Sequence, residues 1–296
     1  ITKRKHFHGF FFELDYNEAM THSLYIAIGF SLVIVSLIVW KTIGSRKRNK
    51  RRVLLMKQSI PATWQAFIEK NIPLYKRLPE GLKQQLHGLV NVFLAEKKFI
   101  GCGGQEITDE VRVTVAAQAC MLLLNRKPRF FPKLKTIYVY PHTYVAKGLM
   151  NDGGIMVEGK SVRLGESWQN GPVVLAWDSI TGGARNIQDG QNVVLHEFAH
   201  QLDQEDGDAD GAPILENRSS YRTWAAVLSE EYDNLRDKTH HRRRSVVRKY
   251  GATNPAEFFA VATEAFFEKP KQMHKRSPEL YEELKRYYKL DPLTWD

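Results

Sequence analysis

Two histidines and a glutamate stand at a spacing that suits metal-assisted hydrolysis. The segment reads His196-Glu197-Phe198-Ala199-His200, an H-E-x-x-H pattern in apolar surroundings that are compatible with a helix. Residues four apart share one face of a helix, so both imidazoles can approach the same ion. Zinc accepts two such nitrogens and keeps one coordination position for water, from which Glu197 could take a proton. The pattern therefore predicts a buried helix that carries two ligands of a catalytic zinc site.

A third protein ligand is needed, and no third histidine follows at the offset of the longer zinc motif, where Asp203 and Asp206 stand instead. We expect a carboxylate from a later helix. Residues 254–268 predict such a helix, because Asn254 is a good N-cap and Pro255 suits the first helical position. The candidates on this helix are Glu257, Glu264 and Glu268. Glu257 and Glu264 are seven apart and share a face, and the pattern by itself does not choose between them.

The rest of the chain predicts short helices and a few strands. Leucines and other apolar residues recur at helical spacing within 61–98, with turns at Ile72-Pro73 and Leu78-Pro79. Thr108 predicts the cap of a buried helix that runs to about Leu124. Strands are expected over 135–140 and 172–177, and hairpin or loop structure over the Gly-rich stretch 148–171. Helices dominate from about residue 191. The pattern indicates an α+β fold.

Two ordered motifs resemble the Mlc titration factor A family of zinc-dependent peptidases. The first is the His196 motif, and the second runs from Tyr250 to Ala260 as YGATNPAEFFA. The likeness covers about residues 61–292 and includes Pro61–Trp64, the helix 107–124, Tyr138–Pro141, Gly165–Trp168 and Gly171–Val173. That family is itself similar to the catalytic domain of anthrax lethal factor. The resemblance implies a zincin-like metallopeptidase domain with a small sheet and a mostly helical remainder.

The resemblance also implies roles for individual residues. Glu257 becomes the third ligand of a Zn²⁺ cofactor beside His196 and His200, and Tyr250 becomes the phenol that stabilises the oxyanion or donates a proton. Glu264 is then a supporting residue. Peptide or protein substrates are implied, with cleavage that could start at the amino end as in an aminopeptidase, and strand 135–140 could align them by edge pairing.

A second function follows from the same resemblance and belongs to another class. The family binds a transcriptional repressor, Mlc, so the chain could act as an interaction protein that sequesters a repressor of this type. A protein that only binds has no physical need for Glu197, and its presence favours the peptidase. The two functions are compatible.

The N-terminal part of the chain predicts a membrane anchor. Residues 23–40 form an uncharged, mainly apolar run of 18 residues, the lower limit for a transmembrane helix. Seven basic and no acidic residues follow within 41–52, which predicts that the C-terminal part is cytoplasmic. We therefore expect an extension over 1–22, a transmembrane helix over 23–40, a basic linker over 41–60 and the peptidase domain over 61–296. This predicts the inner membrane of a bacterium, or the cytoplasm if the anchor is not translated.

Most of the net charge of +10 belongs to the N-terminal end. The first 52 residues hold ten Lys and Arg against three Asp and Glu, and the other residues hold 33 against 30. A nearly neutral domain argues against direct nucleic-acid binding, so the run 240–249 is interpreted as a solvated linker between helices. The loop 206–211 begins like a calcium loop, but Asn217 at its twelfth position lacks the closing carboxylate.

Overall fold

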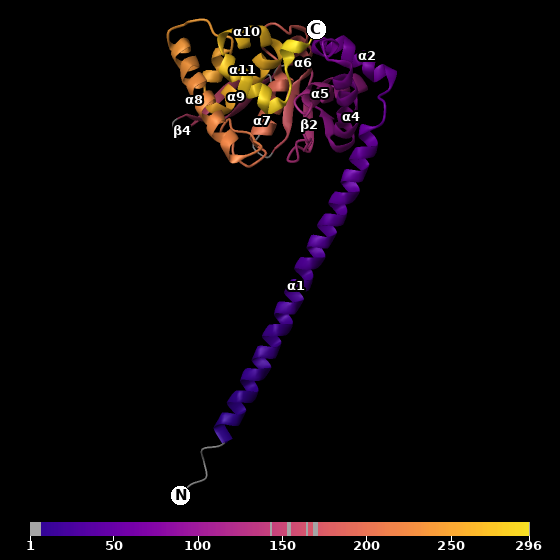
Figure 1. The fold of residues 1–296 in the computed structure, drawn as a ribbon, viewed down its shortest axis with the longest axis vertical. Coiled ribbons are helices and arrows are strands. Elements are labelled where there is room, and N and C mark those ends of the chain that lie inside the picture. Colours follow the sequence, from indigo (N-terminus) through magenta and orange to yellow (C-terminus); the bar gives the residue numbers. More distant parts are fainter. Residues whose placement is uncertain (1–6, 143, 153–154, 164, 168–170, 296) are drawn as a thin grey trace. The chain divides into compact units, whose positions relative to one another are not determined.

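The computed structural model describes residues 7–142, 144–152, 155–163, 165–167 and 171–295, with side chains at 25, 28, 30–142 and 171–295. The chain divides into two units, residues 1–54 and 55–296. Helix α1 (Phe7–Met56) makes up the described part of the first unit, and the other elements belong to the second (Figure 1).

The expected transmembrane helix over 23–40 is wrong. In the part of the chain that the structure describes, no helix is both long enough and apolar enough to cross a membrane. The expected location at an inner membrane depended on this helix and is wrong with it. The run only reaches the minimal length for a span, and within α1 it continues directly into the basic segment 41–52. Residues 1–6 of the expected extension lie outside the described residues.

A small mixed sheet runs through the second unit in the order β1-β2-β6-β5. Three strands are parallel, β1 (Lys98–Gly101), β2 (Thr136–Tyr140) and β6 (Val173–Ala176), and β5 (Gly165–Ser167) runs antiparallel to β6. The strands predicted over 135–140 and 172–177 are thus confirmed, and all four residues of β6 are buried. The fold is mostly helical with a small sheet, which is compatible with the expected α+β class.

The stretch between β2 and β6 contains a separate hairpin. Strands β3 (Tyr144–Asp152) and β4 (Ile155–Arg163) pair antiparallel along their full length, which agrees with the hairpin expected from this Gly-rich region. The motif 165–168 is described only through the backbone of β5, because Trp168 lies outside the described residues.

Strand β2 has a neighbour on each side. Ile137 is in register with Phe99 of β1 and with Val173 of β6. The expectation that strand 135–140 aligns a peptide by edge pairing is therefore wrong, because both of its edges already form ladders. Within the described residues, β5 pairs on one side only, with β6.

Helices cover the sheet. The bounds are α2 (Ala62–Asn71), α3 (Pro73–Lys76), α4 (Glu80–Glu96), α5 (Asp109–Met121), α6 (Trp177–Arg185), α7 (Val193–Asp203), α8 (Arg218–His240), α9 (Pro255–Glu268), α10 (Pro270–Arg276) and α11 (Pro278–Tyr288), with 3₁₀ turns η1 (Lys249–Ala252) and η2 (Pro292–Thr294). In Figure 1, α2, α4 and α5 lie on one side of β2 and α8 to α11 on the other, with α7 between them.

The predicted helix starts are confirmed. Thr108 Oγ1 accepts the Val111 N–H at 3.3 Å and begins α5. Asn254 Oδ1 accepts the Glu257 N–H at 2.9 Å and begins α9. Each cap satisfies a backbone donor that has no partner inside its own helix.

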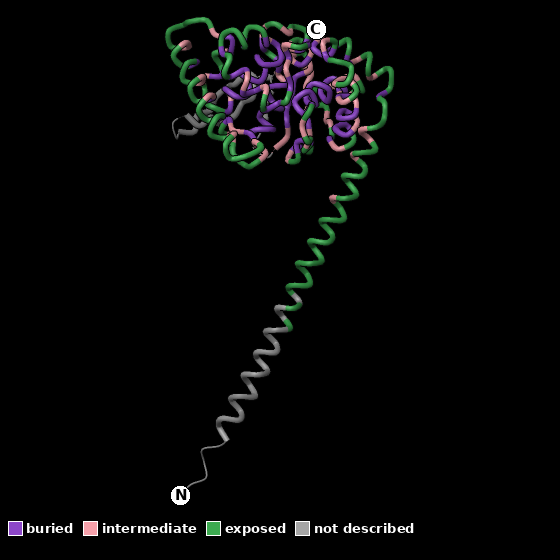
Figure 2. Tube along the Cα trace, in the orientation of Figure 1, coloured by how far each residue is buried: buried purple, intermediate pink, exposed green. Residues whose placement is uncertain are grey.

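Helices α7 and α9 form the centre of the core, where buried positions gather (Figure 2). The phenylalanines of α9 are at most 1% exposed; they are Phe258, Phe259, Phe266 and Phe267. Every residue of α7 from Val194 to Asp203 is buried. Because buried polar groups need partners, the two histidines and the one glutamate of α7 must meet polar groups from neighbouring elements.

Candidate metal centre

Helix α7 places its two histidines side by side. Its N-cap is Asn192, whose Oδ1 accepts the Leu195 N–H at 3.0 Å and fixes the start of the helix. One turn later the Nε2 atoms of His196 and His200 lie 3.2 Å apart. The predicted geometry, two imidazoles on one face of a buried helix, is present.

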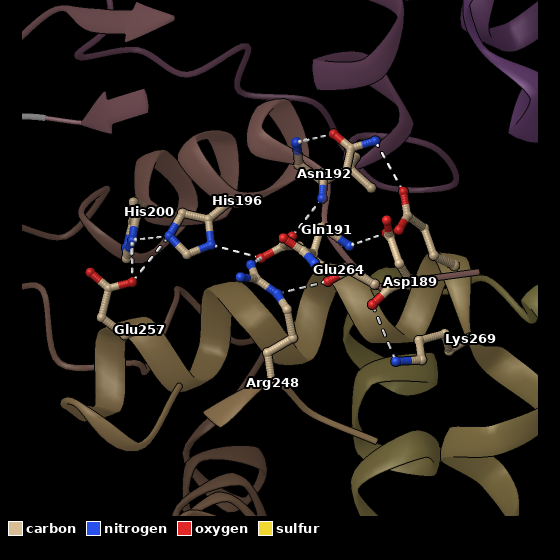
Figure 3. Close-up of polar contacts among 12 residues, drawn as sticks. Asp189, Gln191, Asn192, His196, His200, Arg248, Glu257, Glu264 and Lys269 are labelled. Atoms are coloured by element: carbon tan, nitrogen blue, oxygen red, sulfur yellow. Dashed lines mark hydrogen bonds and ion pairs between the residues drawn. The ribbon is translucent and has the colours of Figure 1, made fainter. Parts of the chain in front are cut away.

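Helix α9 brings a carboxylate to the same point (Figure 3). Glu257 Oε2 lies 3.0 Å from His196 Nε2 and 3.4 Å from His200 Nε2. Glu257 occupies the first turn of α9, three residues after the Asn254 cap. Three ligand atoms from two helices therefore converge.

The three atoms suit a metal ion. Ligands at about 2.0–2.1 Å in tetrahedral positions around zinc stand about 3.3 Å from one another, close to the separations found here. Glu257 Oε2 is buried without a hydrogen-bond partner, as expected for an atom whose partner is an ion. Among the described residues, His196, His200 and Glu257 form the group of acidic, histidine or cysteine side chains that could hold a metal.

The three glutamates of α9 serve different positions. Glu257 reaches the two histidines, whereas Glu264 Oε1 lies 2.8 Å from His196 Nδ1, on the far side of that ring. Glu268 Oε1 accepts from Asn192 Nδ2 at 3.2 Å. One helix thus faces the metal-binding atoms, the back of the first imidazole and the cap of α7 in succession.

Glu264 is the centre of a buried polar network. Its Oε2 accepts the Asn192 backbone N–H, and its Oε1 accepts from Arg248 Nη2, both at 2.6 Å. Arg248 Nε also donates to the Gly190 carbonyl at 2.9 Å. With Glu264 as the partner of Nδ1, His196 turns Nε2 toward Glu257, and carboxylates in this position commonly orient metal-binding histidines.

The electrostatics of this cluster favour a cation. Burial by itself would lower the pKa of His196, but contacts with Glu257 and Glu264 outweigh it and raise the pKa to about 10. Burial would likewise raise the pKa of Glu257, whereas contacts with His196 and then His200 hold it well below its usual range. Positive charge between these carboxylates is therefore strongly stabilised.

Glu197 and Tyr250 flank the converging atoms. Glu197 is 5% exposed and follows His196 directly on α7, and its charge contributes to raising the pKa values of both His196 and Tyr250. The Tyr250 ring, on η1, lies 6.0 Å from the His196 ring. Burial, followed by the charges of Glu257 and Glu197, raises the pKa of Tyr250 to about 12, so its phenol keeps its proton at neutral pH.

The run 240–249 divides into two parts. Residues 240–244 are exposed, as a solvated linker requires. Arg248 is only partly exposed and binds Glu264, a role that sequence reasoning missed. The position of Arg248, two residues before the candidate site residue Tyr250, was the sequence signal that could have indicated a contact near the site.

The acidic loop 206–211 uses its carboxylates locally. Asp206 Oδ1 accepts the Asp208 N–H at 3.3 Å, and Asp210 Oδ1 accepts the Ala212 N–H at 3.0 Å. These contacts are typical of turns, consistent with the interpretation of this segment as an acidic loop.

Comparisons with known proteins agree with this geometry. The family described as glucose-regulated metallo-peptidase M90 matches residues 45–289, which include both motifs. An uncharacterised protein of Synechocystis sp. is 41% identical over 245 residues, 82% of this chain and 89% of the relative. Mlc titration factor A of Yersinia pestis is 32% identical over 233 residues, 76% of this chain and 83% of the relative. As the resemblance in its motifs indicated, the chain belongs to the glucose-regulated metallo-peptidase M90 family, together with Mlc titration factor A.

Proposed function

We propose that this protein is a zinc-dependent peptidase with His196, His200 and Glu257 as metal ligands, Glu197 as the general base and Tyr250 as the oxyanion donor. The observation that carries the proposal is the convergence of the three ligand atoms at separations of 3.0, 3.2 and 3.4 Å. The membership in a metallo-peptidase family supports it.

The donor set fits zinc, since two imidazole nitrogens and one carboxylate form a known catalytic combination that leaves a position open. A zinc ion held there would supply a water of lowered pKa and a Lewis acid for the scissile carbonyl.

Glu197 transfers protons in this proposal, and Tyr250 donates a hydrogen bond. Glu197 accepts a proton from the attacking water and passes it to the leaving amine, the usual work of a positioned carboxylate. The Tyr250 phenol donates a hydrogen bond to the carbonyl oxygen as negative charge develops on it. Both residues sit beside the metal ligands, and Tyr250, with 52% exposure, is accessible to a substrate.

Strand β5 is the element that we propose for holding an extended substrate. It packs against α7 and, within the described residues, has a ladder on one side only. An added peptide strand would gain backbone hydrogen bonds there. The proposal includes cleavage from the amino end, which the family resemblance suggests and which a comparison of free and acetylated peptides tests.

The decisive experiment compares the full chain with its Glu197→Gln variant on a broad peptide pool. We expect equal zinc content and a hydrolysis rate that falls by about 10²–10⁴-fold, because the substitution removes the base and keeps the ligands. Glu231→Gln is the matched control, since Glu231 accepts a hydrogen bond from Ser277, which lies outside the metal centre, and it should keep full activity. Equal hydrolysis by wild type and Glu197→Gln, or no hydrolysis by the zinc-loaded wild type, contradicts the proposal.

A second candidate function is binding of an Mlc-type transcriptional repressor, favoured by the 32% identity to Mlc titration factor A. Titration calorimetry of the full chain with a purified repressor of this type tests it. We expect binding in the micromolar range or tighter for both wild type and Glu197→Gln. The absence of heat at these concentrations counts against this function and leaves the peptidase proposal untouched.

A further inference from the structure

A cavity adjoins helix α7 on the side away from the candidate metal ligands. Its volume is about 740 Å³, within the range of small-molecule sites. The cavity wall comes from α7, α8, α11 and the segments that follow α5 and precede α8, and none of the three candidate metal ligands lines it. Leu202 lines it from α7, two residues after His200. Successive helical residues are about 100° apart, so these two side chains point in roughly opposite directions.

The cavity wall has an excess of positive charge. It contains five cations and three acids, which are Arg126, Lys127, Arg129, Arg286, Lys289, Glu205, Glu216 and Glu283. Each acid already has a partner, in the pairs Arg129–Glu205 at 3.3 Å, Arg286–Glu283 and Lys289–Glu216. Among the described side chains, no carboxylate lies within ion-pair distance of Arg126 or Lys127. The cavity wall therefore has a formal surplus of two positive charges.

The Arg126 guanidinium stacks on an aromatic ring, and one of its nitrogens lacks a hydrogen-bond acceptor. Its guanidinium carbon lies 4.1 Å from the centre of the Tyr287 ring, which fixes the side chain by a cation–π contact. Its Nη1 is buried and has no hydrogen-bond partner. A buried cationic donor without an acceptor is costly, and a ligand oxygen would form a charge-assisted hydrogen bond with it.

The N-terminal end of helix α8 lines the same cavity. Ser219, Ser220 and Thr223 come from its first two turns, and the hydroxyls of both serines donate to Asn217 Oδ1, at 2.6 and 3.1 Å. Asn217 Oδ1 accepts the Ser220 N–H at 3.0 Å, so the helix begins here. The N-terminal end of a helix carries partial positive charge and favours phosphate groups.

We propose that this cavity binds a small phosphate monoester, with its phosphate at Arg126 and Lys127 and its organic part against Trp224 and Tyr287. A phosphate monoester carries about −1.5 to −2 charges near neutral pH, which matches the two uncompensated cations. A carboxylate carries only one. The proposal concerns binding alone and does not depend on peptidase activity.

Titration calorimetry of the full chain with phenyl phosphate tests the proposal, with benzoate as the carboxylate of similar shape. We expect saturable binding of phenyl phosphate and at least about tenfold weaker binding of benzoate. Arg126→Gln should weaken phenyl phosphate binding at least about tenfold, since it removes the buried cation. Arg236→Gln is the matched control, because Arg236 is exposed on α8 and pairs with Asp233 outside the cavity; it should bind as wild type does.

Two further variants distinguish loss of the phosphate site from misfolding and from binding at the metal centre. Lys127→Glu changes an exposed residue, so it reports on the site even if Arg126→Gln fails to fold. It should also weaken binding at least about tenfold. Glu257→Ala should bind phenyl phosphate normally, because the metal centre is not involved. The proposal is overturned by undiminished binding in Lys127→Glu, by loss of binding only in Glu257→Ala, by tighter binding of benzoate, or by no binding to the wild type.

Discussion

Glu264 shows how a single buried carboxylate can orient a histidine of the proposed zinc site. It meets His196 Nδ1 at 2.8 Å, the Asn192 backbone N–H at 2.6 Å and Arg248 at 2.6 Å. These contacts use both carboxylate oxygens and tie the ring to the start of α7. The charge of Arg248 compensates the buried carboxylate, which would otherwise be costly in the core.

At this scale we predict that Glu264→Gln weakens zinc binding about 10–100-fold, the usual cost of losing a partner of a ligating histidine. The amide keeps the shape of the side chain but loses its charge, so both the His196 and Arg248 contacts weaken. Competition with a fluorescent zinc chelator measures the affinity. Glu231→Gln should bind zinc as the wild type does, and a Glu264→Gln variant that matches it would refute this role.

At the scale of elements, Gly211 contacts both the last residue of α7 and the first residue of α9. Its N–H donates to Asp203 Oδ2 at 3.1 Å, and its carbonyl accepts from Trp224 Nε1 at 2.9 Å. A Cβ on Gly211 would lie 2.5 Å from the carbonyl oxygen of Pro255. Since Pro255 is the first residue of α9, this close approach sets where the helix that carries Glu257 begins.

We therefore predict that Gly211→Ala both destabilises the protein and weakens zinc binding. Gly104 provides a matched comparison, because its φ of +86° resembles the +81° of Gly211 but no atom lies within 4 Å of its added Cβ. Gly104→Ala should cost about 1–2 kcal/mol from backbone strain alone and leave zinc affinity unchanged. Gly211→Ala should cost more, because the start of α9 must shift. Thermal melting and zinc titration measure the two effects, and equal behaviour of the variants would show that the contact does not position α9.

At the scale of the whole molecule, the second unit buries several acidic groups. Glu197, Glu264 and Glu268 are each at most 5% exposed. Burial, reinforced by the charges of Glu264 and Asp189, raises the pKa of Glu268 from its ordinary 4.5 to about 8. The folded protein thus keeps a proton on Glu268 at pH values where the unfolded chain has lost it.

This predicts a pH dependence of global stability with a definite sign. Between pH 4.5 and about 8 the folded state binds more protons than the unfolded state, so raising the pH lowers the free energy of unfolding. The Glu268→Gln variant keeps an acceptor for Asn192 and has no proton to lose. The free energy of unfolding of Glu268→Gln minus that of the wild type should be larger at pH 8 than at pH 5 by on the order of 3 kcal/mol. This corresponds to about 6–12 °C in melting temperature.

Calorimetric melting of both proteins across this range measures the difference, in which pH effects common to both cancel. Glu231→Gln should stay parallel to wild type. A constant difference between wild type and Glu268→Gln would mean that Glu268 ionises in the folded protein at its ordinary pKa.

The sequence by itself determined the features that depend on local periodicity and chemistry. The spacing of His196 and His200 requires one helix face, Asn254 and Pro255 define a helix start, and the apolar run 172–177 predicts a buried strand. These signals act over a few residues, so they can be read without knowing the fold. The length of an apolar run is a weaker signal, and over 23–40 it led to a transmembrane helix that the structure contradicts.

The tertiary structure decided how distant elements meet. The pattern on α9 left Glu257 and Glu264 open as ligands and the family resemblance assigned Glu257, whereas the packing of α9 on α7 places one at the histidine Nε2 atoms and the other at Nδ1. Sheet order likewise removed strand 135–140 as an edge and left β5 beside α7. The sequence placed Arg248 in a run of solvated basic residues, whereas in the structure Arg248 donates to the buried Glu264. Such outcomes depend on relative orientations of elements, which hydrophobic spacing along one segment does not encode.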